Sequence, residues 1–157
     1  MEIERKFLVD DPPDLDGCES VEIEQGYLAL GDRGGAEVRL RRKGDELVLT
    51  VKGGSGEVRT EEEIELDRDR FESLWPLTEG LRVTKTRYLI PDGELTVELD
   101  LYSGRLEGLS TAEVEFASEE DADRYRAPDW LGSEVTGDER YLNARLATGG
   151  MPPGVGD

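Results

Sequence analysis

Charged and apolar residues alternate at every second position through several short segments of this chain. The segment ELTVELDL (residues 94–101) has leucine or valine at each odd position and an acid or threonine at each even position. The segment EVRLRRK (residues 37–43) has glutamate, arginine or lysine at each odd position, opposite Val38, Leu40 and Arg42. Since successive side chains of a β-strand point to opposite faces of a sheet, the pattern predicts strands with one apolar face and one heavily charged face.

Eight such segments are separated by breaks rich in glycine, aspartate or proline, among them KGD, GGSG and PDG. The expected strands are Glu2–Val9, Val21–Leu30, Glu37–Lys43, Leu47–Lys52, Glu57–Leu66, Arg82–Ile90, Glu94–Leu101 and Thr111–Phe116. Several breaks are short enough for hairpins, which predicts a mostly antiparallel sheet in a mainly β (α+β) protein.

Three short helices are expected, at Asp67–Trp75, Ser118–Arg126 and Asp138–Ala147. Pro76 ends the first, and the sequence SEED opens the second with a capping-box pattern. A chain of 157 residues without an internal repeat suits one domain, which we place at residues 1–147. Residues 148–157 show no periodicity, and we expect them to form a disordered tail.

The composition excludes several classes of function. With 38 acids against 19 bases the net charge is −19, which disfavours nucleic acids and anionic membranes as partners. The absence of histidine excludes Ser-His-Asp and Cys-His catalysis and histidine-ligated zinc, and the single cysteine excludes an intramolecular disulfide. No apolar run could span a membrane, and a signal peptide has no room before Glu2, so we expect a cytoplasmic protein.

Two architectures satisfy the alternation. In a sandwich or half-open sheet, the apolar faces pack together and the charged faces meet water. In an eight-stranded antiparallel closed β-barrel of inverted polarity, the apolar faces point outward onto a few short covering helices and the charged faces line a hydrophilic lumen. The alternation alone favours the sandwich. The kind of charge favours the barrel, because arginine recurs on these faces where lysine would serve equally well in water.

The charged faces also carry the two groups that a metal–polyphosphate complex requires. Arginine presents a rigid donor fork that matches phosphate oxygens. Carboxylates occur in pairs two residues apart, as Glu2/Glu4 and Glu113/Glu115, and such neighbours repel unless a cation lies between them. Oxygen-only ligands suit Mg²⁺ or Mn²⁺. For any single base or acid, the competing interpretation is an ordinary intramolecular salt bridge.

The motifs resemble those of the CYTH family, also called triphosphate tunnel metalloenzymes. The opening EIERKF contains the ExExK signature, and it is followed by QGYL, VRLRRKG, LTVKGGSGEVRTEEEIEL, VTKTRY, ELDLYSGRLEGL, AEVEF and EVTGDERYLNARLA. This resemblance covers nearly the whole chain before the tail. It implies an eight-stranded tunnel, and so selects the barrel, and it implies a divalent-metal-dependent enzyme that acts on triphosphate groups. The chain looks most similar to short bacterial tripolyphosphatases.

The resemblance also implies roles for individual residues. The expected metal ligands are Glu2, Glu4, Glu113 and Glu115. The expected phosphate-binding residues are Lys6, Arg39, Arg41, Lys52, Arg59, Lys85 and Arg87. The residues expected to bind a second metal, or to orient the lysines and arginines, are Glu61, Glu63, Glu98 and Asp100. Tyr27 is expected to pair with Lys85, whose depressed pKa would let it activate water; activation of water by the metal is the alternative. Arg140, Tyr141 and Asn143 are expected to dock the last helix.

The predicted reaction is hydrolysis of inorganic tripolyphosphate to pyrophosphate and phosphate, by a monomer or homodimer. Within the enzyme class, the alternatives are hydrolysis of thiamine triphosphate or a nucleoside triphosphate, or class IV adenylate cyclase activity. Outside it, the alternative is a non-catalytic module that binds polyphosphate. Such a module would keep the bases but would not need the paired acids, so the acids favour catalysis.

Overall fold

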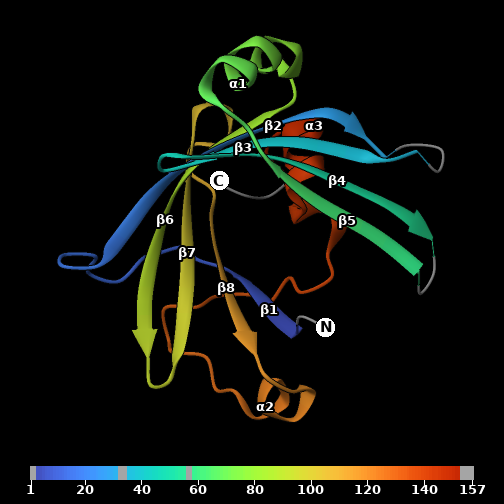
Figure 1. Cartoon of the computed structure of the whole chain (residues 1–157). Helices are drawn as coiled ribbons and strands as arrows, with labels where there is room; N and C mark the ends of the chain where they lie inside the picture. Colours follow the sequence, from blue (N-terminus) through green and yellow to red (C-terminus); the bar gives the residue numbers. More distant parts are fainter. Residues whose placement is uncertain (1–2, 32–34, 56–57, 153–157) are drawn as a thin grey trace.

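The computed structural model describes residues 3–31, 35–55 and 58–152 (Figure 1). Its strands are β1 (Ile3–Leu8), β2 (Glu19–Leu30), β3 (Glu37–Lys43), β4 (Glu46–Ser55), β5 (Val58–Glu65), β6 (Arg82–Asp92), β7 (Leu95–Ser103) and β8 (Ser110–Phe116). All pairs are antiparallel, in the order β1-β8-β7-β6-β2-β3-β4-β5. The eight-stranded antiparallel sheet is therefore confirmed. Among the described residues β1 and β5 are the two end strands of a curved sheet and do not pair with one another, so the closed barrel is not confirmed (Figure 1).

The free edge of β1 is occupied by the chain's own C-terminal segment. Leu8 N donates to Ser133 O (2.9 Å), Gly132 N donates to Leu8 O (2.7 Å), and Val135 N donates to Lys6 O (2.8 Å). Arg5 secures the same segment through an ion pair with Glu134 at 2.6 Å. Because an uncovered strand edge leaves backbone groups unpaired, this segment takes the place that β5 would occupy in a closed barrel.

One part of the outer face of the sheet is a core covered by α2 (Glu119–Arg124). Phe7, Val97, Leu99 and Val114 are buried there and belong to one apolar cluster with β8. These are the residues that the alternation assigned to the apolar parity, and they face away from the charged side chains of the same strands. Apolar surface therefore points outward onto a helix, as the barrel of inverted polarity requires.

The other part of the outer face is covered by α1 (Arg68–Leu74) and the 3-10 helix η2 (Trp75–Thr78). Phe71 is buried beneath α1, and Asp67 caps this helix by accepting a hydrogen bond from Arg70 N at 2.8 Å. A Cβ atom at Gly26 of β2 would lie 2.5 Å from Thr78 Oγ1, so only glycine lets η2 approach the strand this closely. The first predicted helix is present, and Pro76 lies within η2.

The C-terminal helix differs from the prediction. Residues expected in one helix form the short 3-10 helix η4 (Glu139–Tyr141) and, after an extended Leu142, the α-helix α3 (Asn143–Gly149). A further 3-10 helix, η3 (Gly104–Leu106), follows β7. A contact with a residue far away in the sequence accompanies the break. Lys6 Nζ donates to the Tyr141 carbonyl at 2.6 Å, and an uninterrupted helix would use that oxygen for its own hydrogen bonds. The helix extends into the stretch expected as a tail, of which residues 153–157 lie outside the described part.

Helix α3 packs on the inner face of the sheet, against β2 and β6. Leu146 and Ala147 lie in a second apolar cluster with Tyr27, Val83 and Tyr102. One end of the concave side is therefore filled with apolar side chains, and the charged side chains are left to line the remainder. No described helix has the length and hydropathy needed to cross a membrane.

Candidate active site

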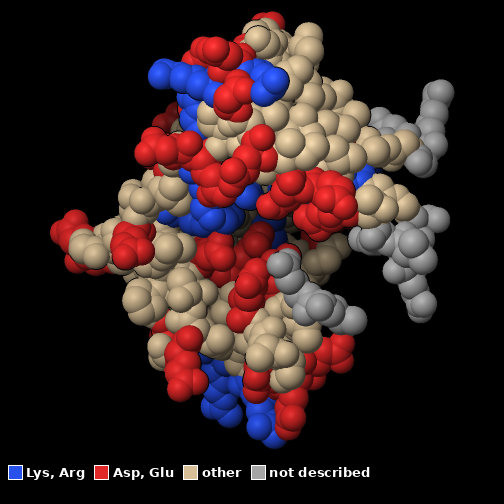
Figure 2. All heavy atoms as spheres, in the orientation of Figure 1, with Lys and Arg blue, Asp and Glu red and all other residues tan. Residues whose placement is uncertain are grey.

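A cavity of about 590 Å³ lies on the concave face of the sheet, at the centre of Figure 2. Its described lining takes side chains from every strand except β5 and from the segment after β8. The lining residues are Glu4, Lys6, Tyr27, Glu37, Arg39, Arg41, Lys52, Arg87, Glu98, Glu113, Glu115, Val135, Thr136, Gly137, Asp138, Leu142, Asn143 and Ala144. Figure 2 shows lysine and arginine atoms inside a hollow framed by acidic side chains.

The strand order separates the two signs of charge. The acids Glu4, Glu98, Glu113 and Glu115 come from the neighbouring strands β1, β8 and β7, and we call them the acidic wall. The bases Arg39, Arg41 and Lys52 come from β3 and β4, which adjoin one another in the same sheet, and we call them the cationic wall. The cavity thus offers carboxylate oxygens on one side and cationic donors on the other.

The acidic wall is crowded. Glu4 lies opposite Glu115 in the β1–β8 ladder, and Lys6 lies opposite Glu113 with its Nζ 3.5 Å from Oε1. Burial, and then the negative charge of Glu113, raise the pKa of Glu4 to about 7. A carboxyl group so perturbed becomes fully ionised at neutral pH only when a cation approaches it. Glu2, the fourth expected ligand, lies outside the described residues.

These acids suit a hard divalent cation as a donor set. Within the described ranges, no group of three or more acidic side chains could hold a metal ion by itself. Mg²⁺, however, commonly uses one or two carboxylates and completes its shell with water and substrate phosphate oxygens. The raised pKa of Glu4 and the absence of nitrogen or sulfur donors on this wall fit that arrangement.

Asp100 lies beneath the cavity in a buried ion-pair network. Its carboxylate is 2.8 Å from Lys85 Nζ and accepts from Arg87 Nε at 2.8 Å, and Arg87 also reaches Glu98 at 2.8 Å. Burial alone would raise the pKa of Asp100, but Lys85 and Arg87 outweigh it, and the pKa falls below its ordinary value. Asp100 thus contacts both Lys85 and Arg87, and Glu98 contacts Arg87.

Tyr27 and Lys85, which the resemblance pairs, have other partners here. Burial raises the pKa of Tyr27 to about 12, against the opposing positive charge of Arg39, which faces it in the β2–β3 ladder. Lys85 is 3% exposed, contacts Asp100, and is opposite Ile23 rather than Tyr27 in the β2–β6 ladder. Burial lowers the pKa of Lys85 against the opposing effect of Asp100. Tyr27 lines the cavity, whereas Lys85 lies beneath it.

The two arginines of the cationic wall lack such internal partners. Among the described residues, neither Arg39 nor Arg41 has a carboxylate within ion-pairing distance. Burial, and then the charges of Arg39 and Arg87, lower the pKa of Arg41. The third base, Lys52, lies 3.8 Å from Glu61 in an exposed pair. These positive charges are held close together by the β3–β4 register, and an anion in the cavity would relieve their repulsion.

The remaining expected residues lie at the margin of the site. Glu61 and Glu63 face Lys52 and Thr50 across the β4–β5 ladder, but both are exposed and neither lines the cavity. The side chain of Arg59 lies outside the described part of the chain. Among the docking residues, Tyr141 is buried and Asn143 accepts from Tyr102 at 3.3 Å, whereas Arg140 pairs with Asp138 on the surface.

The sequence interpretation missed part of the lining. Glu37 and the segment from Val135 to Asp138 border the cavity, and Asn143 and Ala144 of α3 close it on one side. Glu37 lies on the same face of β3 as Arg39, so the alternation of charged residues could have identified it as a lining residue. The segment after β8 has no periodicity, so its position could not be inferred from the sequence.

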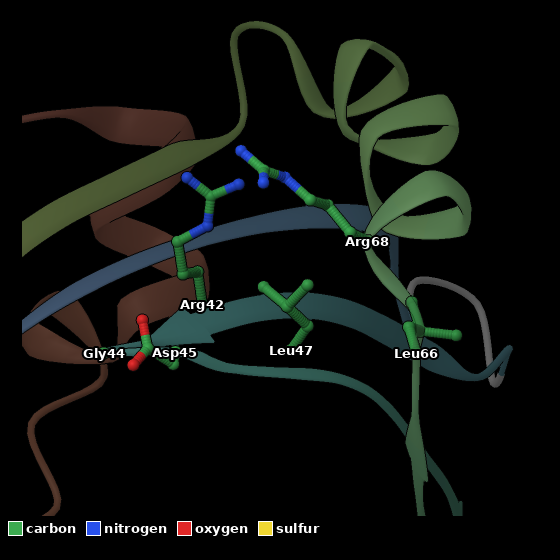
Figure 3. A pocket seen from close by; sticks show the side chains of 6 residues that line it. All are labelled: Arg42, Gly44, Asp45, Leu47, Leu66 and Arg68. Atoms are coloured by element: carbon green, nitrogen blue, oxygen red, sulfur yellow. The ribbon is translucent and has the colours of Figure 1, made fainter.

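A second cavity, of about 520 Å³, lies on the outer face beneath α1 (Figure 3). Arg42 and Arg68 point toward one another there. Arg42 lies over the Phe71 ring at 5.1 Å, and Arg68 pairs with Glu72 at 3.1 Å. The contact with Phe71 explains Arg42 by helix docking, and Arg68 is paired within α1, on the face of the sheet opposite the charged cavity.

Comparisons with known proteins agree with this geometry. The family model described as the CYTH domain matches residues 1–142. An inorganic triphosphatase of Nitrosomonas europaea is 49% identical over 148 residues, covering 93% of this chain and 96% of the relative. An inorganic triphosphatase of Acetivibrio thermocellus is 39% identical, with 92% of each covered. The crystal structure of an inorganic triphosphatase superposes with a TM-score of 0.80 at 44% identity, covering 94% of this chain and 95% of the other. The chain belongs to the CYTH family.

Proposed function

We propose that this protein hydrolyses inorganic tripolyphosphate to pyrophosphate and phosphate. The observation that carries the proposal is the cavity whose cationic wall has unpaired arginines and whose acidic wall faces it. A triphosphate chain bears several negative charges, and burying it requires cationic donors of this kind. Relatives at 49% and 39% identity that are inorganic triphosphatases support the same substrate.

A divalent cation, Mg²⁺ or Mn²⁺, belongs to this proposal. Glu4, Glu113 and Glu115 would hold it, together with Glu2. When bound, it would neutralise phosphate charge and polarise a phosphoryl oxygen.

The bases would bind and align the substrate. We assign Arg39, Arg41, Lys52, Arg87 and Lys6 to the phosphate oxygens, and Arg59 by its place in the motif. Phosphoryl transfer demands little covalent chemistry from a protein, so positioning and charge neutralisation account for most of the rate.

Lys85 is our candidate for the group that takes a proton from the attacking water. Burial lowers its pKa, which favours the neutral amine that can accept a proton. This role requires Lys85 Nζ to leave Asp100 and to reach the cavity wall where Tyr27 lies. Asp100, with Glu98, would hold Arg87 in place meanwhile.

We also propose that the barrel closes around the substrate. The edge strand β5 carries Glu61 and Glu63 beside Lys52. An anion shared between the two walls would draw β4 and β5 toward the segment 132–135 that covers the edge of β1. We assign Glu61 and Glu63 to orienting Lys52 rather than to a second metal. Small-angle scattering tests closure: a smaller radius of gyration with tripolyphosphate is expected, and an unchanged radius would contradict it.

The wider setting follows from charge and size. The cavity suits a small anion, and a net charge of −19 opposes binding to nucleic acid or an anionic membrane. We place the enzyme in the cytoplasm, as a monomer or homodimer.

The test is phosphate release from tripolyphosphate, ATP and thiamine triphosphate, each with Mg²⁺, with Mn²⁺ and with EDTA. We expect metal-dependent turnover with tripolyphosphate as the preferred substrate. Equal or faster turnover of an organic triphosphate would overturn the choice of substrate. Binding of tripolyphosphate without turnover of any compound would replace the enzyme by a polyphosphate-binding module.

A further inference from the structure

Three buried polar atoms near the cavity have no hydrogen-bond partner among the described residues. They are Gln25 Nε2, Arg39 Nε and Thr50 Oγ1. Gln25 and Thr50 are each 2% exposed. A buried polar group without a partner is uncommon in native proteins, and each instance requires an explanation.

The three atoms belong to one patch. In the β-ladders, Arg39 is opposite Tyr27 of β2 and Thr50 of β4, and Gln25 is opposite Arg41. Side chains two residues apart on a strand share a face, and directly opposite residues have Cβ atoms about 5 Å apart. Gln25 and Thr50 therefore flank Arg39 and Arg41 on the concave face, immediately behind the cationic wall.

The chemistry of the patch specifies what its partner must be. The amide nitrogen of Gln25 and Nε of Arg39 can only donate, and the Thr50 hydroxyl can donate as well. The Thr50 hydroxyl could also accept, but no hydrogen bond joins the three atoms, and two of them can only donate, so the patch is best completed by acceptor oxygens. Glu63 is opposite Thr50 on β5, but it is exposed and Thr50 does not donate to it. The carboxylates that line the cavity come mostly from the opposite wall.

We infer that Gln25 and Thr50 are further substrate-binding residues, which donate hydrogen bonds with Arg39 to the phosphate group seated deepest against β2, β3 and β4. This inference rests on the proposed function. A phosphate oxygen bound by Arg39 Nε lies within reach of its cross-strand neighbour Thr50. Because the donors are covered in the free protein, Arg39 and Arg41 must part as the substrate enters.

This inference predicts opposite effects on folding and on substrate binding. An unpaired buried donor loses its hydrogen bonds to water when the protein folds, and this loss costs free energy. Removing the donor therefore leaves the free protein equally stable or more stable. The same change removes a hydrogen bond to a charged phosphate, which weakens binding by about 10-fold or more. A donor with a purely structural partner would behave in the reverse way, with lower stability and unchanged binding.

The experiment uses the near-isosteric variants Thr50→Val and Gln25→Leu in the full chain. For each we measure KM and kcat for tripolyphosphate with Mg²⁺, and the thermal unfolding midpoint without substrate. We expect KM to rise about 10-fold or more, with the midpoint unchanged or higher. Thr50→Ser, which keeps the hydroxyl, should retain the wild-type KM.

A matched control lies on the other face of the sheet. Thr86 on β6 donates to Glu22 at 2.9 Å, so Thr86→Val should leave KM unchanged. If the wild type hydrolyses tripolyphosphate and the Thr50 and Gln25 variants keep its KM, the inference is wrong and the proposed function stands. If the wild type hydrolyses no triphosphate, the proposed function fails and the inference fails with it.

Discussion

The acidic and cationic walls of the cavity differ in how their charges are balanced. On the acidic side, Lys6 faces Glu113 at 3.5 Å and Arg87 holds Glu98 at 2.8 Å. On the cationic wall, Arg39 and Arg41 have no carboxylate partner among the described residues. The acidic wall therefore has counter-charges within the protein, whereas the two arginines of the cationic wall have none among the described residues. This difference supports our proposal that the substrate binds on β3 and β4 and the metal opposite.

The largest effect is expected from Glu4→Gln. The change removes a charged oxygen from the proposed metal ligands, and we expect kcat to fall by about 10³-fold or more. Because burial, and then the charge of Glu113, already raise the pKa of Glu4, the neutral amide should leave the unfolding midpoint unchanged or higher. Turnover close to that of the wild type would remove Glu4 from the metal site.

Asp100→Asn should have the next largest effect, on stability. It leaves Lys85 buried without its carboxylate partner, and breaking a buried ion pair in this way costs about 3–5 kcal/mol. Denaturant unfolding measures the loss. The double variant Lys85→Met with Asp100→Asn should regain part of it, and a single variant as stable as the wild type would show that the network is not stabilising.

The cationic wall is tested by Arg41→Gln. We expect KM for tripolyphosphate to rise by about 10-fold or more, because a charge-assisted hydrogen bond to phosphate is lost. Burial lowers the pKa of Arg41, so its removal should not lower the unfolding midpoint. Arg42→Gln is the matched control, since Arg42 lies on the outer face (Figure 3). Equal effects of the two changes would contradict the distinction between the faces.

The buried network also predicts a dependence on pH. The pKa of Asp100 is lower in the folded protein than in the unfolded chain, so its contribution to stability is complete above the ordinary aspartate pKa of about 4 and is lost as pH falls through the folded value. The difference in unfolding free energy between wild type and Asp100→Asn should therefore shrink as pH decreases from 6 to 3. A difference that is constant over this range would contradict the lowered pKa.

The smallest effect is expected from Glu61→Gln. Its pair with Lys52 is exposed and 3.8 Å long, and such pairs contribute about 0–1 kcal/mol. We expect kcat to change by less than about 5-fold, since each 1.4 kcal/mol corresponds to a factor of ten. A large fall in kcat would reassign Glu61 to a metal and place β5 in the active site.

The sequence predicted the strands well because charge alternation is a local signal. Strand β3 has the bounds that its alternation predicted, Glu37–Lys43, and the charged parities of β1, β7 and β8 converge on one cavity. The break at Leu142 could not be predicted, because it depends on Lys6, which is more than 130 residues earlier in the chain. For the same reason the pairing of residues 132–135 with β1, which leaves the sheet open, has no signal in the sequence.

The sequence predicted which charged residues lie on the inner face, but it did not predict which acid pairs with which base. Alternation placed Glu98, Asp100, Lys85 and Arg87 on the charged face, yet which base meets which acid depends on the β6–β7 register. That register puts Arg87 opposite Asp100 and leaves Lys85 buried beside it. The buried donors Gln25 and Thr50 carry no charge, so a search for charged side chains did not find them.

The most direct test of the two-wall arrangement is a crystal structure with tripolyphosphate bound. We expect phosphate oxygens within hydrogen-bond distance of Arg39, Arg41 and Lys52, with the metal ion between the phosphates and Glu4. An anion seated instead in the outer cavity between Arg42 and Arg68 (Figure 3), with the concave face empty, would contradict the account.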